Sequence, residues 1–139
     1  MDKKKILMID DARLNLATAR EVLKDDYALY EATSAKQGFE IMEEVLPDLI
    51  LLDIIMPEMD GYEMITQLKS TRRLKSIPVI FLTAVADPVS EVKGFNLGAV
   101  DFITKPFVAP VMKRRIATQL ELYSYQNELE DIVEQKVEE

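Results

Sequence analysis

Five polar residues stand directly after short apolar runs of the sequence, which makes them candidates for a chemical role. They are Asp10, Asp11, Asp53, Thr83 and Lys105. Asp53 ends the run LILLD, so its carboxylate is either a poorly placed surface group or a group held in place for chemistry. Carboxylates that gather in one place repel one another unless a cation binds between them. Oxygen ligands without His or Cys suit Mg²⁺ or a similar oxygen-preferring ion.

Taken singly, each of these residues also has an ordinary structural explanation. Asp11 precedes a helical pattern and is as readily an N-cap as a metal ligand. A threonine such as Thr83 is common in the turn after a strand, and a lone lysine such as Lys105 is usually solvated. A shared site therefore requires that the fold brings all of these residues to one edge.

Short apolar runs alternate with helical patterns five times along the chain. The strands are predicted at 5–10, 27–33, 48–53, 77–84 and 100–106, and the helices at 12–25, 34–46, 61–70, 87–99 and from about 108 onward. Continuous Val, Ile and Leu runs are typical of a parallel sheet that is covered on both faces, and this order favours an open, doubly wound α/β fold. Such sheets bind ligands beyond the carboxyl ends of their strands, where the five polar residues stand.

The composition excludes several classes of function. The 139 residues fit one domain, and a net charge of -8 argues against nonspecific nucleic-acid binding. No apolar run approaches the roughly 20 residues that span a bilayer, and the N-terminus lacks the apolar core of a secretory signal. The absence of His and Cys removes disulfides, thiolate sites and Ser-His or Cys-His catalysis. We expect a cytoplasmic protein without a direct nucleic-acid or membrane partner.

The combined motifs resemble the receiver domain of response regulators, of the chemotaxis type, in two-component signalling. The resemblance rests on Asp10-Asp11, on DIIMPEMDG beginning at Asp53, on Thr83 and on TKPF around Lys105, and it covers about residues 4–120. It implies a flavodoxin-like, five-stranded parallel sheet of order 2-1-3-4-5 with five helices, and a receiver domain over residues 1–120. Such a domain is no general enzyme, because it catalyses only its own phosphorylation and dephosphorylation.

The resemblance also implies a role for each polar residue. Asp53 is the expected phosphoacceptor, taking a phosphoryl group from a phosphohistidine on a sensor histidine kinase or a phosphotransfer protein. The expected Mg²⁺ ligands are Asp10, Asp11, Asp53 and the backbone carbonyl of Ile55. The expected partners of the phosphoryl oxygens are Thr83 and Lys105.

Phosphorylation is expected to switch a surface made of residues 87–97, residues 100–104 and the start of the last helix. The switch residues implied by the resemblance are Thr83 and Phe102, although Phe102 is equally well explained as a plain core residue. The resemblance further implies a cis peptide bond between Lys105 and Pro106.

The residues two positions beyond Asp53 and Thr83 bear on the lifetime of the phosphorylated state. They are Ile55 and Val85, which are apolar where polar side chains could help to place an attacking water. We therefore expect the phosphoaspartate to decay slowly.

The last part of the chain, residues 121–139, differs in composition from the rest. Its apolar residues follow the 3-4-3 spacing of a heptad seam, with Lys136 at the next seam position: Leu122, Tyr125, Leu129 and Ile132. One interpretation is a single amphipathic helix with a solvated acidic face. The favoured interpretation is a parallel homodimeric coiled coil that links the receiver to an output domain absent from this chain, such as a cyclic-di-GMP phosphodiesterase or diguanylate cyclase.

Two other classes of protein share parts of this pattern. A phosphatase of the haloacid-dehalogenase type also uses an Asp, a Thr and a Lys at strand ends, but it usually needs an acidic residue where this chain has Ile55. A flavodoxin-like nucleotide or flavin binder would need a phosphate-binding loop. The chain contains only four glycines, and no glycine-rich loop follows the first strand.

Overall fold

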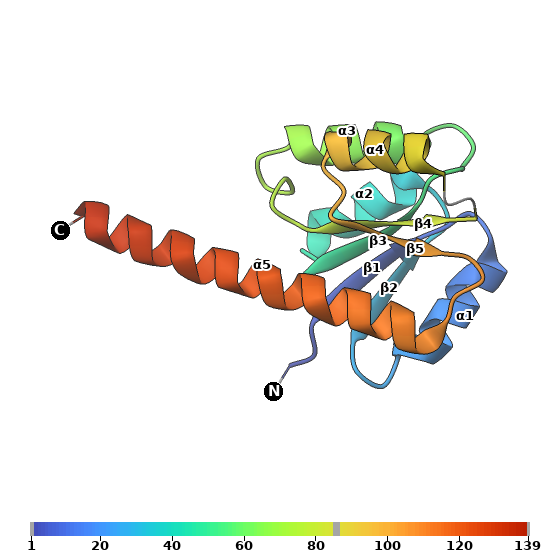
Figure 1. Ribbon diagram of the computed structural model, residues 1–139, viewed down its shortest axis with the longest axis horizontal. Coiled ribbons are helices and arrows are strands. Elements are labelled where there is room, and N and C mark those ends of the chain that lie inside the picture. The colour runs from blue at the N-terminus through green and yellow to red at the C-terminus, as the bar shows by residue number, and fades with distance from the viewer. Residues whose placement is uncertain (1, 85–86, 139) are drawn as a thin grey trace.

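The computed structural model describes residues 2–84 and 87–138, and it alternates strands and helices (Figure 1). The strands are β1 (Lys5–Ile9), β2 (Ala28–Ala32), β3 (Leu49–Asp53), β4 (Val79–Thr83) and β5 (Asp101–Thr104). The helices are α1 (Arg13–Leu23), α2 (Ala35–Glu44), α3 (Gly61–Ser70), α4 (Pro88–Leu97) and α5 (Ala109–Glu138). Each predicted strand and helix is therefore present.

The five strands form one parallel sheet in the order β2-β1-β3-β4-β5, as predicted. The inner strands β3 and β4 are buried along their whole length, which explains their uninterrupted apolar runs. In the register of the sheet, Ile9 pairs with Leu52, Asp53 with Leu82, and Thr83 with Thr104. The carboxyl ends of these strands consequently lie at one edge, and the residues that follow them meet there.

Helices cover both faces of the sheet (Figure 1). One core lies between the sheet and α2 and α3, and it contains Met42, Met64, Leu68, Phe81 and Phe102. The other lies between the sheet and α1 and α5, and it contains Leu16, Leu23, Met112, Ile116 and Leu120. Alternate residues of each buried strand point into opposite cores, which holds the strand ends rigidly.

The ends of several elements differ by one or two residues from the prediction. The predicted helices 34–46 and 87–99 include their N-caps, Ser34 and Asp87, whose side chains accept hydrogen bonds from the first turn. Helix α4 is terminated by its C-cap, Gly98, directly after Leu97. Gly98 has a φ of 115° and so adopts the left-handed conformation that glycine allows. The predicted strand 100–106 stops at Thr104 because Pro106 has no N–H for the ladder.

Helix α5 continues for 30 residues, and its C-terminal half extends away from the sheet (Figure 1). The predicted seam residues Leu122, Tyr125 and Leu129 are 55%, 59% and 62% exposed, so the described part of the chain leaves most of their surface uncovered. Ile132 is also exposed, whereas the side chain of Lys136 lies outside the described part. Within residues 2–84 and 87–138, no helix is long and apolar enough to cross a membrane.

Candidate functional site

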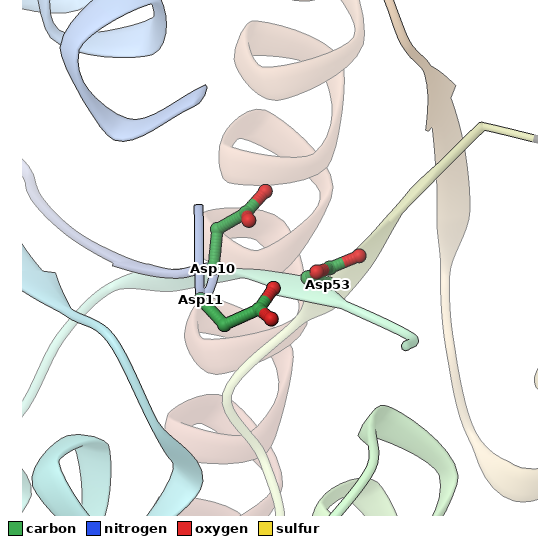
Figure 2. Close-up of side chains that lie close together, drawn as sticks. All are labelled: Asp10, Asp11 and Asp53. Carbon is green, nitrogen blue, oxygen red and sulfur yellow. The ribbon is translucent and has the colours of Figure 1, made fainter. Parts of the chain in front are cut away.

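Three carboxylates meet at the carboxyl edge of the sheet (Figure 2). Asp10 and Asp11 follow β1, and Asp53 is the last residue of β3. Asp10 is fully buried and Asp53 is 5% exposed, whereas Asp11 is exposed to solvent. One oxygen from each of the three groups lies within 4.8 Å of the others, which is close enough for a single cation to bind all three.

Lys105 places one positive charge between two of these carboxylates. Its Nζ lies 2.9 Å from Asp10 Oδ2 and 2.9 Å from Asp53 Oδ1. The backbone N–H of Lys105 donates to the carbonyl of Thr83 at 2.8 Å, which fixes the start of this side chain beside β4. The Lys105–Pro106 bond is cis, as predicted. The ammonium thus partly neutralises a buried cluster that would otherwise repel itself.

The carboxylate of Asp10 accepts hydrogen bonds on both of its oxygens. The N–H of Ala12 donates to Oδ1 at 2.9 Å, and the amide Nδ2 of Asn15 donates to Oδ2 at 3.1 Å. Asn15 lies in the first turn of α1 and was not among the predicted site residues. No pattern in the sequence marked it, because its contact with Asp10 depends on how the start of α1 is placed over the end of β1.

The environment of Asp53 disfavours its ionised form. Burial, together with the negative charge of Asp10, raises the pKa of Asp53 to about 6, although the hydrogen bond from Lys105 opposes the shift. For Lys105, burial lowers the pKa, but the hydrogen bonds and charges of Asp53 and Asp10 outweigh burial, so the pKa is raised. Lys105 is therefore cationic at neutral pH, and Asp53 is largely ionised there.

The loop after β3 is fixed by close backbone packing. A Cβ at Gly61 would lie 2.6 Å from the carbonyl oxygen of Asp53, so only glycine allows α3 to begin here. The N–H of Gly61 donates to the carbonyl of Ile54 at 2.7 Å. Asp60 caps α3 in a capping box with Glu63. These contacts hold the backbone that follows the carboxylate of Asp53.

A cavity of about 400 Å³ contains all five predicted polar residues. The structure adds Asn15 from α1, Tyr62 from α3 and Ser90 from α4 to its lining, none of which the sequence analysis identified. A larger groove of about 550 Å³ lies between α2 and the loop after β3. None of the five predicted polar residues lines this groove. The smaller cavity, which carries the reactive side chains, is therefore the candidate site.

Phe102 points into the protein, where it packs between Phe81 and Phe95. It is 7% exposed, and its ring centroid lies 5.6 Å from that of Phe81 and 5.0 Å from that of Phe95. A Cβ at Gly94 would lie 2.6 Å from Phe102 Cζ, so α4 approaches this ring as closely as glycine allows. Thr83 is buried at the end of β4, and Val85 lies outside the described residues.

Comparison with known proteins identifies the family. The model of the response regulator receiver domain matches residues 6–117. A protein of Vibrio cholerae serotype O1, described as a probable cyclic di-GMP phosphodiesterase, is 45% identical over 116 residues, which are 84% of this chain and 26% of that protein. Histidine kinase P4 of Formosa agariphila is 33% identical over 120 residues, which are 86% of this chain and 9% of that protein.

A solved structure agrees with these matches. The signal receiver domain of a signal transduction histidine kinase from Syntrophus aciditrophicus superposes with a TM-score of 0.77 at 33% identity, covering 85% of this chain and 90% of that chain. This chain spans about a quarter or less of the two curated relatives described above. The family match decides against the two other classes of protein considered from the sequence, a phosphatase of the haloacid-dehalogenase type and a flavodoxin-like nucleotide or flavin binder. The chain belongs to the response regulator receiver domain family and has the phosphoacceptor role of that family in two-component signalling.

Proposed function

We propose that Asp53 is the phosphoacceptor and that a histidine kinase or phosphotransfer protein supplies the phosphoryl group. The main support is the position of its carboxylate, at the end of a buried strand and 2.9 Å from the Lys105 ammonium. A carboxylate oxygen of Asp53 attacks the phosphorus, the bond to the donor imidazole nitrogen breaks, and its electron pair stays on that nitrogen. Lys105 and Thr83 then stabilise the phosphoryl oxygens.

We also propose that Mg²⁺ binds to Asp10, Asp11, Asp53 and the backbone carbonyl of Ile55. The donor set fits this ion, since the three carboxylates offer hard oxygens within 4.8 Å of one another. When bound, Mg²⁺ would offset the negative charge of the carboxylates and the phosphoryl group, which otherwise repel one another. The protein's own part is to hold Asp53 in line with its donor, because phosphoryl transfer depends mainly on positioning and electrostatics.

Intact mass spectrometry after incubation with acetyl phosphate tests this proposal. The wild type should gain about 80 Da, one phosphoryl group, only when Mg²⁺ is present, and D53N should gain nothing. D60N is the matched control, because Asp60 lies in the same loop and Asn is an equally good N-cap. An adduct that persists in D53N would place the acceptor elsewhere.

We propose that phosphorylation acts on the surface of α4, β5 and α5, through Thr83 and Phe102. Apolar residues are exposed on this surface, among them Val89, Val92 and Phe95 on α4, Val108 just before α5 and Val111 on α5. Phe102 touches both Phe81 in the core and Phe95 at the surface, so a movement of its ring would reach α4. Phosphorylation shifts this equilibrium only by its differential interaction with the two states.

The C-terminal helix supports a homodimer. We propose that residues 1–120 form the receiver and that residues 121–139 form a parallel coiled coil through the exposed seam. Replacing Leu122 and Leu129 together by Glu should give a monomer in multi-angle light scattering. The paired variant S124E/N127E, which adds the same charge on the outward side, should leave the oligomeric state unchanged. Equal masses for the two variants would refute the proposal that the seam residues mediate dimerisation.

An output enzyme of cyclic-di-GMP metabolism is the proposed target of the switch. The support is the Vibrio cholerae relative described as a probable cyclic di-GMP phosphodiesterase, which shares 45% identity with this chain. In a longer protein that contains this chain, acetyl phosphate should change the rate of cyclic-di-GMP turnover, and D53N should abolish that change. A rate of cyclic-di-GMP turnover that phosphorylation does not change would refute the assignment. A cytoplasmic location remains a prediction from the sequence.

The phosphorylated state is proposed to decay slowly. Ile55 lines the cavity and is 79% exposed, and its hydrocarbon side chain has no group that could hydrogen-bond a water approaching Asp53. The decay of the adduct after removal of the phosphodonor measures this lifetime, and I55N should shorten it. A wild-type half-life of seconds would contradict the proposal.

A further inference from the structure

Asn15 joins the site from a helix rather than from a strand end. It is the third residue of α1, it is partly buried, and it lines the same cavity as Asp53. Its Nδ2 donates to Asp10 Oδ2 at 3.1 Å, across the start of the helix. An amide that hydrogen-bonds a carboxylate fixes the plane of that carboxylate, and this matters most where the carboxylate must bind a cation.

The second donor to the same oxygen has another task. Lys105 Nζ is 2.9 Å from Asp10 Oδ2, and it is equally close to Asp53 Oδ1. Once Lys105 turns to a phosphoryl group on Asp53, its contact with Asp10 weakens, because one ammonium cannot hold its former geometry toward all of these oxygens. Among the described residues, Asp10 then keeps the Asn15 amide and, on its other oxygen, the Ala12 N–H at 2.9 Å.

We infer that Asn15 is a positioning residue, which shares with Lys105 the support of the Asp10 carboxylate in its cation-binding orientation and keeps that orientation when Lys105 turns away. This inference rests on the proposed function, since it assumes that Asp10 binds Mg²⁺. Asn15 itself touches neither the phosphoryl group nor the reacting carboxylate of Asp53. It acts through Asp10, and its loss should therefore appear in the affinity for Mg²⁺.

A purely structural role makes a different prediction. Ala12, the N-cap of α1, makes no side-chain capping bond, so Asp10 and Asn15 together could simply stabilise the start of the helix. In that case, removal of the amide would lower the free energy of unfolding without Mg²⁺ and leave the dissociation constant for Mg²⁺ unchanged. Metal affinity thus separates the two roles.

Titration calorimetry with MgCl₂ on the full chain is the test, without any phosphodonor. N15L, which keeps the size of the side chain but removes the donor, should bind Mg²⁺ about ten-fold more weakly than the wild type, as loss of a partner of a metal ligand commonly does. T18V is the matched control on the same helix, because the Thr18 hydroxyl donates to the carbonyl of Leu14 in its own helix and Thr18 is not among the residues that line the cavity. N15A serves in its place if N15L does not fold.

A second pair of titrations tests the sharing of Asp10 with Lys105. In a K105M background, Asn15 is the remaining side-chain donor to Asp10 in the described part of the chain, so N15L should there reduce the affinity by a larger factor than in the wild type. Equal factors would overturn the argument that the two donors support the same oxygen.

The outcomes also separate this inference from the proposed function. If the wild type binds no Mg²⁺, the proposed cation site itself is wrong. If the wild type binds Mg²⁺ and N15L matches it within about two-fold, below the loss expected for a partner of a metal ligand, the site stands and the role of Asn15 is refuted.

Discussion

The D53N variant should be more stable than the wild type, and the gain should depend on pH. In the folded protein, burial raises the pKa of Asp53 from its ordinary value of 3.8 to about 6. The folded state therefore binds more protons than the unfolded state between these two values. Above pH 6 the ionised carboxylate of Asp53 therefore lowers the free energy of unfolding. This penalty disappears as the pH falls below 3.8.

The size of the effect follows from the same shift. A difference of about 2.2 pKa units, from 3.8 to about 6, corresponds to about 3 kcal/mol at pH 7 and above, and to about half of that at pH 5. This figure is an upper bound, because Asn leaves Lys105 with only one carboxylate, Asp10. We expect D53N to raise the free energy of unfolding by about 1–3 kcal/mol at pH 7.5.

Urea unfolding followed by circular dichroism measures this difference, in a buffer with EDTA, at several values between pH 4.5 and 8. D25N is the control, since Asp25 is an exposed residue after α1 and should give no gain. Mg²⁺ should reduce the advantage of D53N, because it stabilises the folded wild type by binding to it. A gain for D53N that is constant across this pH range, or a loss of stability, would refute the electrostatic account.

Three further substitutions test close packing and the hydrogen bonds of a lysine side chain. G61A places a Cβ 2.6 Å from the carbonyl oxygen of Asp53 and should destabilise the fold by about 1–3 kcal/mol in urea unfolding, whereas a neutral result would show that α3 shifts freely. G94A should displace Phe102, whose Cζ lies 2.6 Å from the added atom, and a changed near-ultraviolet circular dichroism spectrum would report it. K69M removes the ammonium that donates to two loop carbonyls at 3.0 Å and should cost about 1–3 kcal/mol, while equal stability would mean that water replaces it.

Most of the fold follows from local patterns in the sequence. Uninterrupted apolar runs mark the buried strands, and the helical spacing between them sets the alternation that makes the sheet parallel. The polar residues of the site could be found because they directly follow those runs. A parallel sheet places every such position on the same edge, so Asp53 and Lys105 become neighbours although 52 positions separate them.

Other parts of the site depend on contacts that no local pattern records. Asn15 resembles any polar residue in the first turn of a helix until the helix is placed over Asp10. Gly94 stands inside a helix, and its role appears only when the Phe102 ring is packed against it. The ends of predicted elements were also wrong by a few residues, because caps such as Ser34 continue the sequence pattern but not the helical backbone.

The sequence by itself determined the order of the elements, the edge on which the site lies and the exposed seam of the last helix, because each of these follows from spacing along one segment. The tertiary structure decided which donors share the Asp10 carboxylate, how far burial raises the pKa of Asp53, and that Phe102 points inward. These properties depend on distances of a few ångströms between separate segments, and such distances exist only once both faces of the sheet are packed.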